Sequence, residues 1–340
     1  MVKLSIVILN WNGKGMMEKY LPSVCRFSEM NDVEVVVADN GSTDDSIAFL
    51  KDNFPSVRIV ALDDNYGFAD GYNRALAQLE AEYFLLLNSD VEVTENWLSP
   101  LLTFMDANSD VAACQPKIRS LIETSKFEHA GACGGYIDKY AFPFCRGRIF
   151  GNVESDVAQY DSVADIFWAT GAALMIRSND FSAVGGLDGS FFAHMEEIDL
   201  CWRLRSRGRR VVCVPQSVVF HLGGGTLNVE NPRKTFLNFR NNLLMIYKNS
   251  PDKYLKRVLI ARFFFDYVAA LQYCLKGDFP NAKAIYRARR EFSKLRHEYD
   301  GKRAANISAQ TLRNIPEVLN RSIVLQSYVL GKKKFSDLVF

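Results

Sequence analysis

Short apolar segments alternate with helix-length segments along the first third of the chain, and this alternation restricts the possible fold more than any other feature. The segments between the apolar runs have the length of helices: Lys14–Phe27, Asp44–Asn53, Gly67–Glu80 and Asn96–Asn108. Strands that are apolar on both faces and alternate with helices predict an α/β fold, with a mostly parallel sheet flanked by helices. The predicted strands are rich in Val, Ile and Leu: Leu4–Leu9, Glu34–Ala38, Arg58–Leu62, Tyr83–Leu87 and Val111–Cys114.

Polar residues follow the first four predicted strands. Ligands of such sheets bind at the carboxyl ends of the strands, so these residues are expected to border one crevice. No GxGxxG follows the first strand and no GxxxxGK[ST] occurs in the chain, which argues against the usual dinucleotide fold and against a P-loop enzyme. We therefore predict a nucleoside-diphosphate site without a phosphate loop. Its candidate residues are Asn10, Trp11, Asn12, Asp39, Asn65, Asn88 and Asp90.

Within this site two aspartates have separate predicted tasks. Asp39, at the end of the second strand, can accept hydrogen bonds from a base or a ribose. An aspartate at the end of a later strand, such as Asp90, can hold a divalent cation against the diphosphate.

Seven motifs, in order between about residue 3 and residue 250, resemble glycosyltransferase family 2 of GT-A fold, and within it the rhamnosyltransferase-like branch. The resemblance implies a Rossmann-like, mostly parallel sheet, a nucleoside-diphosphate sugar donor and a bound Mg²⁺ or Mn²⁺. The motifs are SIVILNWNG at 5–13, VVVADNGSTDDS at 35–46, NYGFADGYNRA at 65–75, LLLNSDVEV at 85–93, ATGAALMIR at 169–177, VGGLDGSFFAHMEEIDLCWRLRSRG at 184–208 and FHLGGGT at 220–226.

The resemblance also assigns the metal ligands. Family members usually carry a DxD-type sequence whose last Asp binds the cation, and this chain keeps only that carboxylate, Asp90, with Asn88 in the first position. Resembling enzymes carry a His at the place of His221 that can reach the metal or the diphosphate. The alternatives are a plain turn at Asn88–Asp90 and a structural role for His221.

Three carboxylates, Glu196, Glu197 and Asp199, lie within four residues and repel one another in an ordinary helix. Resembling enzymes present an ED motif here, whose carboxylate removes the proton from the acceptor hydroxyl. Glu196 matches the Glu and Glu197 the Asp, so we predict Glu197 as the base and Glu196 as the alternative. Asp199 is expected to fix the helix start or a neighbouring Arg. A helix dipole that favours acidic residues in the first turn explains part of the cluster.

Trp168 and Asp188 lie in the part of the chain that resembles the acceptor side of the family. An aromatic ring such as that of Trp168 can stack on a sugar face. Both residues are therefore candidate acceptor contacts. The alternative interpretation is a strand at residues 168–172 and a tight turn at 185–188.

Charge is distributed unevenly along the chain. Residues 1–232 hold 19 Lys and Arg against 31 Asp and Glu, whereas residues 233–340 hold 22 against 8. A basic final third predicts contact with a polyanion or docking on the acidic part. Lys253–Lys276 and Lys283–His297 suit in-plane binding to an anionic bilayer, and the alternative is a pair of helices packed on the catalytic domain. Nucleic acid is not predicted, because no recognised binding module accompanies the charge.

These observations predict a catalytic domain over residues 1–250, with a nucleotide-sugar half at about 1–115 and an acceptor half at about 116–250, followed by a basic helical C-terminal region at 251–340. No apolar run reaches roughly 18 residues, and no cleavage site follows the N-terminus. The seven cysteines form no CxxC pair. We expect reduced thiols in a cytoplasmic protein, peripheral on the inner face of the cell membrane.

The predicted function is that of an inverting, metal-dependent glycosyltransferase in cell-surface polysaccharide synthesis. Resemblance favours dTDP-rhamnose as the donor, with UDP-hexoses next, and a lipid-linked saccharide as the acceptor. A nucleotidyltransferase on a related α/β core and a catalytically inactive membrane-docking scaffold are the alternatives. Release of pyrophosphate indicates the first, and sugar-nucleotide binding without turnover indicates the second.

Overall fold

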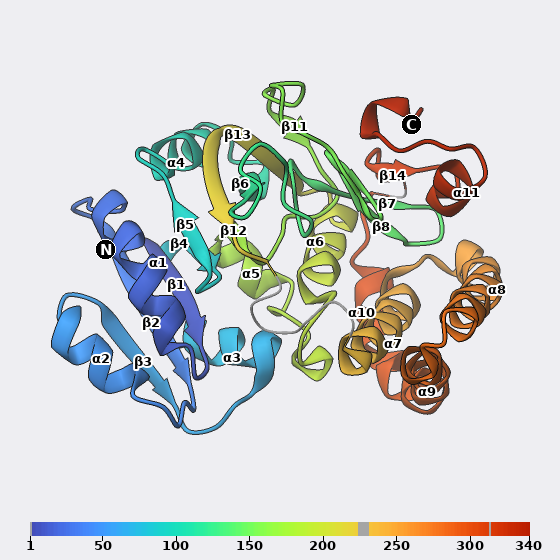
Figure 1. The fold of residues 1–340 in the computed structure, drawn as a ribbon, viewed down its shortest axis with the longest axis horizontal. Coiled ribbons are helices and arrows are strands. Elements are labelled where there is room, and N and C mark those ends of the chain that lie inside the picture. Colours follow the sequence, from blue (N-terminus) through green and yellow to red (C-terminus); the bar gives the residue numbers. More distant parts are fainter. Residues whose placement is uncertain (1, 224–230, 313) are drawn as a thin grey trace.

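The computed structural model describes residues 2–223, 231–312 and 314–340. These residues form a large sheet with helices on both faces, a small second sheet, and a group of long helices contributed by the C-terminal part (Figure 1). The predicted α/β class is confirmed.

The N-terminal part of the large sheet has four parallel strands in the order β4-β1-β2-β3. Along β1, Ile6 and Ile8 enter one core cluster and Val7 enters the other, because successive side chains of a strand point to opposite faces. Burial on both faces explains why these segments are apolar without a break. The bounds are β1 Val2–Asn10, β2 Val33–Asn40, β3 Arg58–Leu62 and β4 Ala81–Leu87.

The helices divide between the two faces of this sheet. The predicted helices are confirmed, although the third ends at Leu76 rather than at Glu80. One core cluster receives side chains from α1 (Lys14–Phe27), α2 (Ser46–Asn53) and α4 (Leu98–Ala107). The other receives side chains from α3 (Gly67–Leu76), α5 (Ser178–Ala183) and α6 (Glu196–Ser206).

The remaining strands make the sheet mixed. β12 (Ala173–Arg177) lies between β4 and β6 (Val111–Ser120) and runs antiparallel to both. β6 pairs in parallel with β13 (Arg210–His221), which also pairs antiparallel with β5 (Val91–Val93) and β11 (Ala164–Asp165). The expected parallel pairing is therefore interrupted between Tyr83–Leu87 and Val111–Cys114, because a later segment of the chain inserts between them.

A second sheet links the middle of the chain to its C-terminal part. β14 pairs in parallel with β7, and the backbone N–H of Ile323 donates to Asp138 Oδ2 at 2.9 Å. The division predicted near residue 250 remains a prediction, but residues beyond it complete this sheet. Its order is β10 (Asn152–Val153), β9 (Arg148–Ile149), β8 (Pro143–Cys145), β7 (Gly135–Asp138) and β14 (Val318–Leu319).

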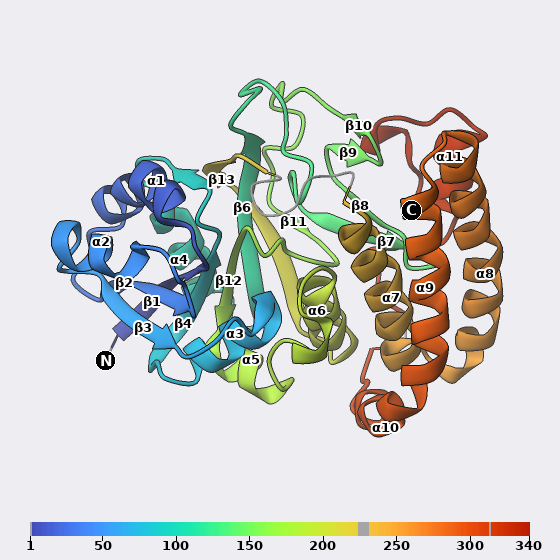
Figure 2. The same cartoon turned by 60° about the horizontal axis from the view of Figure 1, so that its bottom comes forward.

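Three long helices, α7 (Pro232–Asn249), α8 (Asp252–Leu275) and α9 (Phe279–Leu295), pack side by side on the acceptor half of the chain (Figure 2). Among the described residues, α8 is long and apolar enough to cross a membrane, by length and composition only. Its apolar sequence is not continuous, because Arg262 and Asp266 interrupt it. Shorter elements follow or precede them: α10 Asp300–Ser308, α11 Ile323–Tyr328, and the 3-10 turns Gly189–Phe191, Arg296–Tyr299 and Phe335–Asp337.

A buried ion-pair network joins α6 to α7. Lys248 Nζ lies 2.6 Å from Asp188 Oδ2 and 2.8 Å from Asp199 Oδ2, and all three side chains are at most 3% exposed. Asn249 and Arg203 donate to Asp199 at 2.7 and 3.0 Å. Burial alone raises the pKa of Asp188, but Lys248 and Lys302 outweigh it and hold that pKa well below its usual range. The network thus depends on ionised carboxylates.

Lys248→Met is expected to lower the free energy of unfolding by about 3 kcal/mol or more, because two buried carboxylates lose a shared cation. Urea unfolding at pH 7 measures the change, with the exposed Lys276→Met as the control. Asp188 has a depressed pKa in the folded state, so its contribution is present above the unfolded pKa of about 3.9 and declines as the pH falls below that value. Equal denaturation midpoints for the two variants would contradict this account.

Candidate active site

Asn10 and Asp39 lie side by side at the carboxyl ends of β1 and β2, where they are register partners. Asn10 Nδ2 donates to Asp39 Oδ2 at 2.9 Å, and the backbone N–H of Ser42 donates to Asp39 Oδ1, also at 2.9 Å. Both side chains are 1% exposed. Among the described residues Asn10 Oδ1 has no hydrogen-bond partner, so this buried oxygen can accept a hydrogen bond from a ligand.

The other residues predicted at this edge fall into two groups. Trp11 is 53% exposed, so its indole ring can stack on a base. Asn12 and Asn65 instead organise loop backbone: Asn12 Oδ1 accepts from Thr43 N at 2.7 Å, and Asn65 Oδ1 accepts from Gly67 N at 2.9 Å. The structure thus brings all five predicted residues at the ends of β1, β2 and β3 to the same sheet edge. Asn12 and Asn65 serve there to hold the loop backbone.

Asp90 and His221 meet because β5 pairs with the end of β13. His221 Nε2 lies 3.1 Å from Asp90 Oδ1 and 3.4 Å from Asn88 Nδ2. The backbone N–H of Leu222 donates to the carbonyl of Asp90 at 3.1 Å, which holds the two segments together. The two predicted metal ligands are therefore adjacent, although more than a hundred residues separate them in the sequence.

Sequence analysis missed a third member of this cluster, Glu128, which is 5% exposed. Its Oε2 lies 3.5 Å from His221 Nδ1, on the side of the ring opposite Asp90. Burial lowers the pKa of His221, but hydrogen bonding to Asp90 and Glu128 outweighs it and raises the pKa to about 10. A Cβ on Gly223, whose φ is +67°, would lie 2.8 Å from Glu128 Oε1, so the first glycine after His221 makes room for this carboxylate. Gly224, Gly225 and Thr226 of the same motif lie outside the described residues.

The Asp90–His221 pair fits a divalent cation that binds together with a nucleotide. A carboxylate oxygen is a suitable ligand for Mn²⁺ or Mg²⁺, and the imidazole of His221 becomes one when the cation displaces the ring proton. Within residues 2–223, 231–312 and 314–340, no group of three or more His, Cys, Asp or Glu side chains could hold a metal ion. Two protein ligands leave the other positions to phosphate oxygens and water, which is how Mg²⁺ usually binds.

Glu196 and Glu197 begin α6, and both carboxylates are withdrawn from solvent. Burial raises the pKa of Glu197 to about 7, whereas burial and the adjacent Glu197 raise the pKa of Glu196 well above its usual value. In the part of the chain that the structure describes, the Oε2 atoms of both residues lack a hydrogen-bond partner. A carboxylate with a pKa near 7 is suited to general base catalysis at neutral pH.

An unusual turn presents these two glutamates. Phe192, His194 and Met195 all have positive φ, at 65°, 73° and 74°, a conformation that costs free energy in residues other than glycine. Asn241 on α7 holds the turn, because its Nδ2 lies 3.0, 2.9 and 2.8 Å from the carbonyls of Phe191, Ala193 and His194. No motif or periodicity indicates this contact, which joins residues about fifty positions apart.

The same turn touches the nucleotide edge of the sheet. Phe68 N and Ala69 N, in the first turn of α3, donate to the carbonyl of Phe192 at 2.6 and 3.2 Å. A Cβ on Gly67 would lie 2.5 Å from the Phe192 ring. The glutamates at the start of α6 are thus tied to the loop that carries Asn65.

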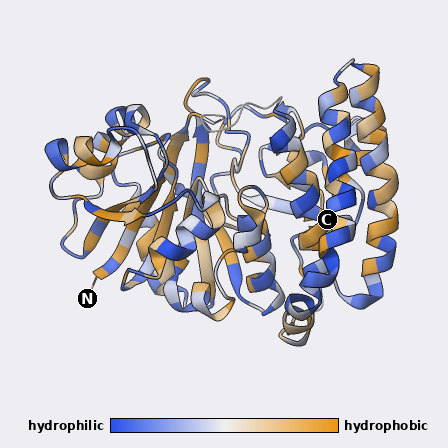
Figure 3. Ribbon diagram, turned by 90° about the horizontal axis from the view of Figure 1, so that it is seen from below, coloured by the Kyte–Doolittle hydropathy of each residue, from blue (hydrophilic) through white to orange (hydrophobic). Residues whose placement is uncertain are grey.

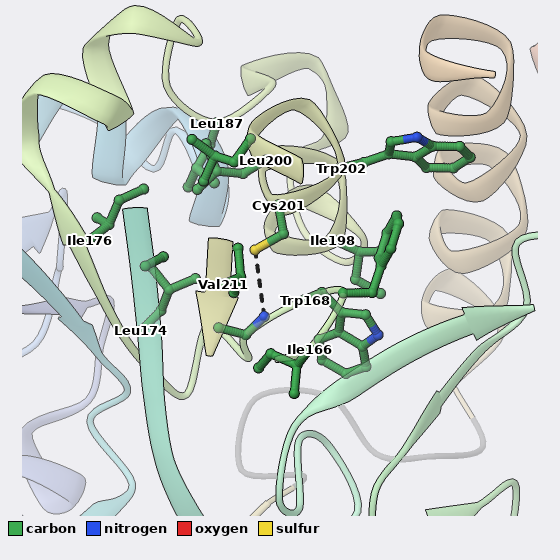
Figure 4. Close-up of a cluster of buried hydrophobic side chains, with 14 of the residues drawn as sticks. Ile166, Trp168, Leu174, Ile176, Leu187, Ile198, Leu200, Cys201, Trp202 and Val211 are labelled. Atoms are coloured by element: carbon green, nitrogen blue, oxygen red, sulfur yellow. Dashed lines mark hydrogen bonds between the residues drawn. The ribbon is translucent and has the colours of Figure 1, made fainter. Parts of the chain in front are cut away.

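The structure contradicts the acceptor contacts predicted for Trp168 and Asp188. Trp168 is 4% exposed and packs among core side chains, with its indole N–H donating to the carbonyl of Tyr136 at 3.0 Å (Figure 4). Its ring cannot stack on a sugar from inside the core. Asp188 is 6% exposed and forms ion pairs with Lys248 and Lys302. Its role is structural, as is that of Asp199, which was expected to hold a neighbouring Arg and does pair with Arg203.

Comparison with known proteins confirms the predicted resemblance. Residues 5–156 match the family model of glycosyl transferase family 2. An N-acetylglucosaminyl-diphospho-decaprenol L-rhamnosyltransferase from Mycobacterium tuberculosis is 28% identical over 241 residues, covering 64% of this chain and 75% of that protein. Rhamnosyltransferase WbbL from Escherichia coli K12 is 26% identical over 169 residues, covering 46% of this chain and 61% of its own length.

Solved structures agree on the fold. The chain matches GalNAc-T7 with UDP, GalNAc and Mn²⁺ with a TM-score of 0.59 at 14% identity, over 93% of this chain and 58% of that one. It matches residues 1–349 of Staphylococcus aureus TarS in complex with UDP-GlcNAc with a TM-score of 0.55 at 16% identity, over 97% and 92% of the two chains. The predicted GT-A fold is thereby confirmed, and the family model and the curated relatives confirm the assignment as a glycosyltransferase.

Proposed function

Because residues 5–156 belong to glycosyltransferase family 2, we propose that this chain moves a sugar from a nucleoside-diphosphate donor to a hydroxyl of a saccharide acceptor, with inversion at the anomeric carbon. The observation that carries the proposal is the Asp90–His221 pair, which lies at the same sheet edge as the buried Asp39. The test is a panel of nucleotide sugars assayed for released nucleoside diphosphate, with and without Mn²⁺ or Mg²⁺.

The donor is proposed to be dTDP-rhamnose, with UDP-hexoses as the alternative. The relatives named as rhamnosyltransferases support the first, and the TarS complex with UDP-GlcNAc supports the second. Asn10 and Asp39 supply buried amide and carboxylate oxygens that can accept hydrogen bonds from the base and ribose. Trp11 supplies an exposed ring beside them.

In the proposed reaction Asp90 and His221 would hold a divalent cation, and this cation would offset the negative charge on the departing diphosphate. The carboxylate of Glu197 takes the proton of the acceptor hydroxyl. The acceptor oxygen then forms its bond to the anomeric carbon while the bond from that carbon to the diphosphate oxygen breaks, and the nucleoside diphosphate leaves with the electron pair. One displacement from the opposite side inverts the anomeric configuration.

The two alternative functions remain distinguishable by product. A nucleotidyltransferase releases pyrophosphate from a nucleoside triphosphate, whereas a scaffold binds nucleotide without turnover. The half-buried Glu197, whose pKa is raised to about 7, favours an enzyme that moves a proton. The glycosyltransferase relatives favour sugar transfer over nucleotidyl transfer.

The acceptor is proposed to be lipid-linked and the enzyme peripheral on an anionic membrane. α8 exposes a stripe of apolar side chains at helical spacing, namely Ile260, Phe264, Val268, Leu271 and Leu275, which are 50 to 81% exposed. At the right-hand edge of Figure 3 this helix carries hydrophobic colour along much of its length. Exposed basic residues flank the stripe: Lys253, Lys256 and Arg257 near one end and Lys276 and Lys283 near the other. An apolar stripe between basic ends suits in-plane binding to anionic lipid.

Asp90→Asn is expected to weaken cation-dependent binding of the nucleoside diphosphate by about tenfold or more, because even changes to outer-shell groups cost metal sites that much affinity. Calorimetry with and without Mn²⁺ measures this effect. The exposed Glu92→Gln, two residues along, is the matched control. Unchanged affinity and unchanged metal response in Asp90→Asn would remove Asp90 from the metal site.

Glu197→Gln keeps the shape of the side chain and removes its basicity. It is expected to lower kcat by ~10² or more while leaving donor affinity nearly unchanged. In the unmodified enzyme kcat should rise as the pH increases through about 7, since the base acts only when deprotonated. If Glu196→Gln shows this loss and Glu197→Gln does not, the base is Glu196.

The intact chain is expected to float with phosphatidylglycerol vesicles at low salt and to detach as salt approaches 1 M, where the screening length shrinks to ~3 Å. The double variant Phe264→Asp with Val268→Asp places two negative charges on the apolar stripe and should abolish flotation. Ile122→Asp, a change at an apolar residue that is 73% exposed elsewhere on the surface, should leave it intact. A wild-type chain that stays off anionic vesicles at low salt ends the membrane proposal.

A further inference from the structure

A cavity of about 920 Å³ opens beside the candidate metal site. His221, Glu128 and Gly223 form part of its wall, and the remainder comes from the loop before β7, from the segment around β10, from the start of α7 and from the C-terminal tail. The volume lies in the range of ligand-binding pockets. Apart from His221, none of the residues assigned to the donor site lines this cavity.

The cavity also borders the helix that holds the turn before the glutamates. Lys234, in the first turn of α7, lines the cavity. Further along the same helix, Asn241 donates to the carbonyls of Phe191, Ala193 and His194. One wall of the cavity therefore includes His221, a proposed ligand of the cation, and another includes the start of the helix that positions the proposed base.

Four lysines from three separate segments line this cavity: Lys126, Lys234, Lys333 and Lys334. The carboxylates around it are largely committed to other partners. Glu123 pairs with Lys126 at 2.6 Å, Glu128 faces His221, and Glu154 accepts from the Tyr160 hydroxyl at 3.0 Å and from the backbone N–H of Phe335 at 2.9 Å. Among the described residues, neither Lys333 nor Lys334 forms an ion pair with these carboxylates.

The C-terminal tail is fixed at the cavity by packing. The ring of Phe335, the residue after Lys334, lies 4.9 Å from the ring of Tyr136 and 5.9 Å from that of Tyr160. Asp337 Oδ2 accepts from the backbone N–H of Lys334 at 3.0 Å. The backbone that presents Lys333 and Lys334 is therefore anchored to the second sheet and its neighbouring loop.

We propose that this cavity binds the acceptor, and that Lys234, Lys333 and Lys334 bind a phosphate or diphosphate group that links the acceptor sugar to its carrier. The inference rests on the proposed function and specifies the acceptor as an anionic sugar phosphate ester. A neutral saccharide has no group that needs several lysines, whereas phosphate oxygens accept charge-assisted hydrogen bonds from ammonium groups. The tail, remote in sequence from the catalytic residues, completes the acceptor site.

Binding of farnesyl diphosphate in the presence of EDTA tests the lysines without turnover, because EDTA prevents capture of the diphosphate by a bound cation. Calorimetry should show binding by the intact chain that weakens at least tenfold in the pair Lys333→Glu and Lys334→Glu. The neighbouring Lys332→Glu is the matched control, since Lys332 belongs to the same run but does not line the cavity. The pair Lys333→Ala and Lys334→Ala should weaken binding in the same direction without introducing repulsion.

Three results would overturn the proposal: no binding by the intact chain, equal binding by the intact chain and the glutamate pair, or equal loss in Lys332→Glu. Inorganic pyrophosphate is the second probe. If it binds at the tail lysines and farnesyl diphosphate does not, the cavity is a site for a free anion rather than for a carrier-linked acceptor.

Kinetics separate this proposal from the proposed function. The Lys333 and Lys334 glutamate pair should raise KM at least tenfold for an acceptor that carries a diphosphate, and leave KM unchanged for the donor and for an alkyl glycoside of the same sugar. An equal rise for both acceptors would assign the tail a structural role. A chain that releases no nucleoside diphosphate from any donor contradicts the proposed function. The binding of farnesyl diphosphate still tests the cavity in that case, because it requires no turnover.

Discussion

The arrangement of this molecule depends on three carboxylates at the start of one helix, two of them buried (Glu196 and Asp199) and one half-buried (Glu197). Asp199 forms ion pairs with Lys248 and Arg203 and accepts a hydrogen bond from Asn249. Separating α6 from α7 would therefore break the buried ion pair between Asp199 and Lys248. Among the described residues, no cation pairs with Glu196 or Glu197, and burial raises both pKa values. Asp199 is thus held by cations and an amide, whereas the raised pKa values of Glu196 and Glu197 suit the proton exchange that general base catalysis requires.

The same helix, α7, supplies the geometry as well as the charge. Asn241 holds three carbonyls of the turn before α6, and Lys248, two turns later, reaches the carboxylates on either side of that turn. Positive φ values at Phe192, His194 and Met195 persist because these contacts, together with the α3 N–H groups on Phe192, over-determine the backbone. α7 lies at residues 232–249, beyond the part of the chain that matches the family model, yet it positions the residues proposed to perform the chemistry.

Features that depend on neighbouring residues in the sequence could be predicted from the sequence. The first four strands and their helices follow from apolar periodicity, and Asp39 and Asp90 follow from their positions after strands of a parallel sheet. Glu128 was missed because only the pairing of β6 with β13 brings its loop to His221, and no periodicity reports that pairing. Trp168 was misassigned because the sequence around an aromatic residue in an apolar segment does not show whether the ring packs in a core or faces a ligand. Asn241 and the tail lysines act across long sequence separations, where a single sequence carries little information about contacts.

The charge asymmetry between the two parts of the chain has more than one structural explanation. Some basic residues of the last third form ion pairs inside the fold: Lys248 and Lys302 both pair with Asp188, and Arg289 pairs with Asp266. Docking on the acidic part, which was one of the alternatives, thus accounts for a share of the asymmetry. It does not account for the lysines that flank the exposed stripe of α8, nor for Lys333 and Lys334 at the cavity. Surface cations that remain after internal pairing are available to external anions. Two groups of them lie beside an apolar helix face and beside the candidate active site. A phosphate-linked lipid acceptor is the kind of molecule that presents an anion and an apolar chain together, so one substrate class accounts for both groups of cations.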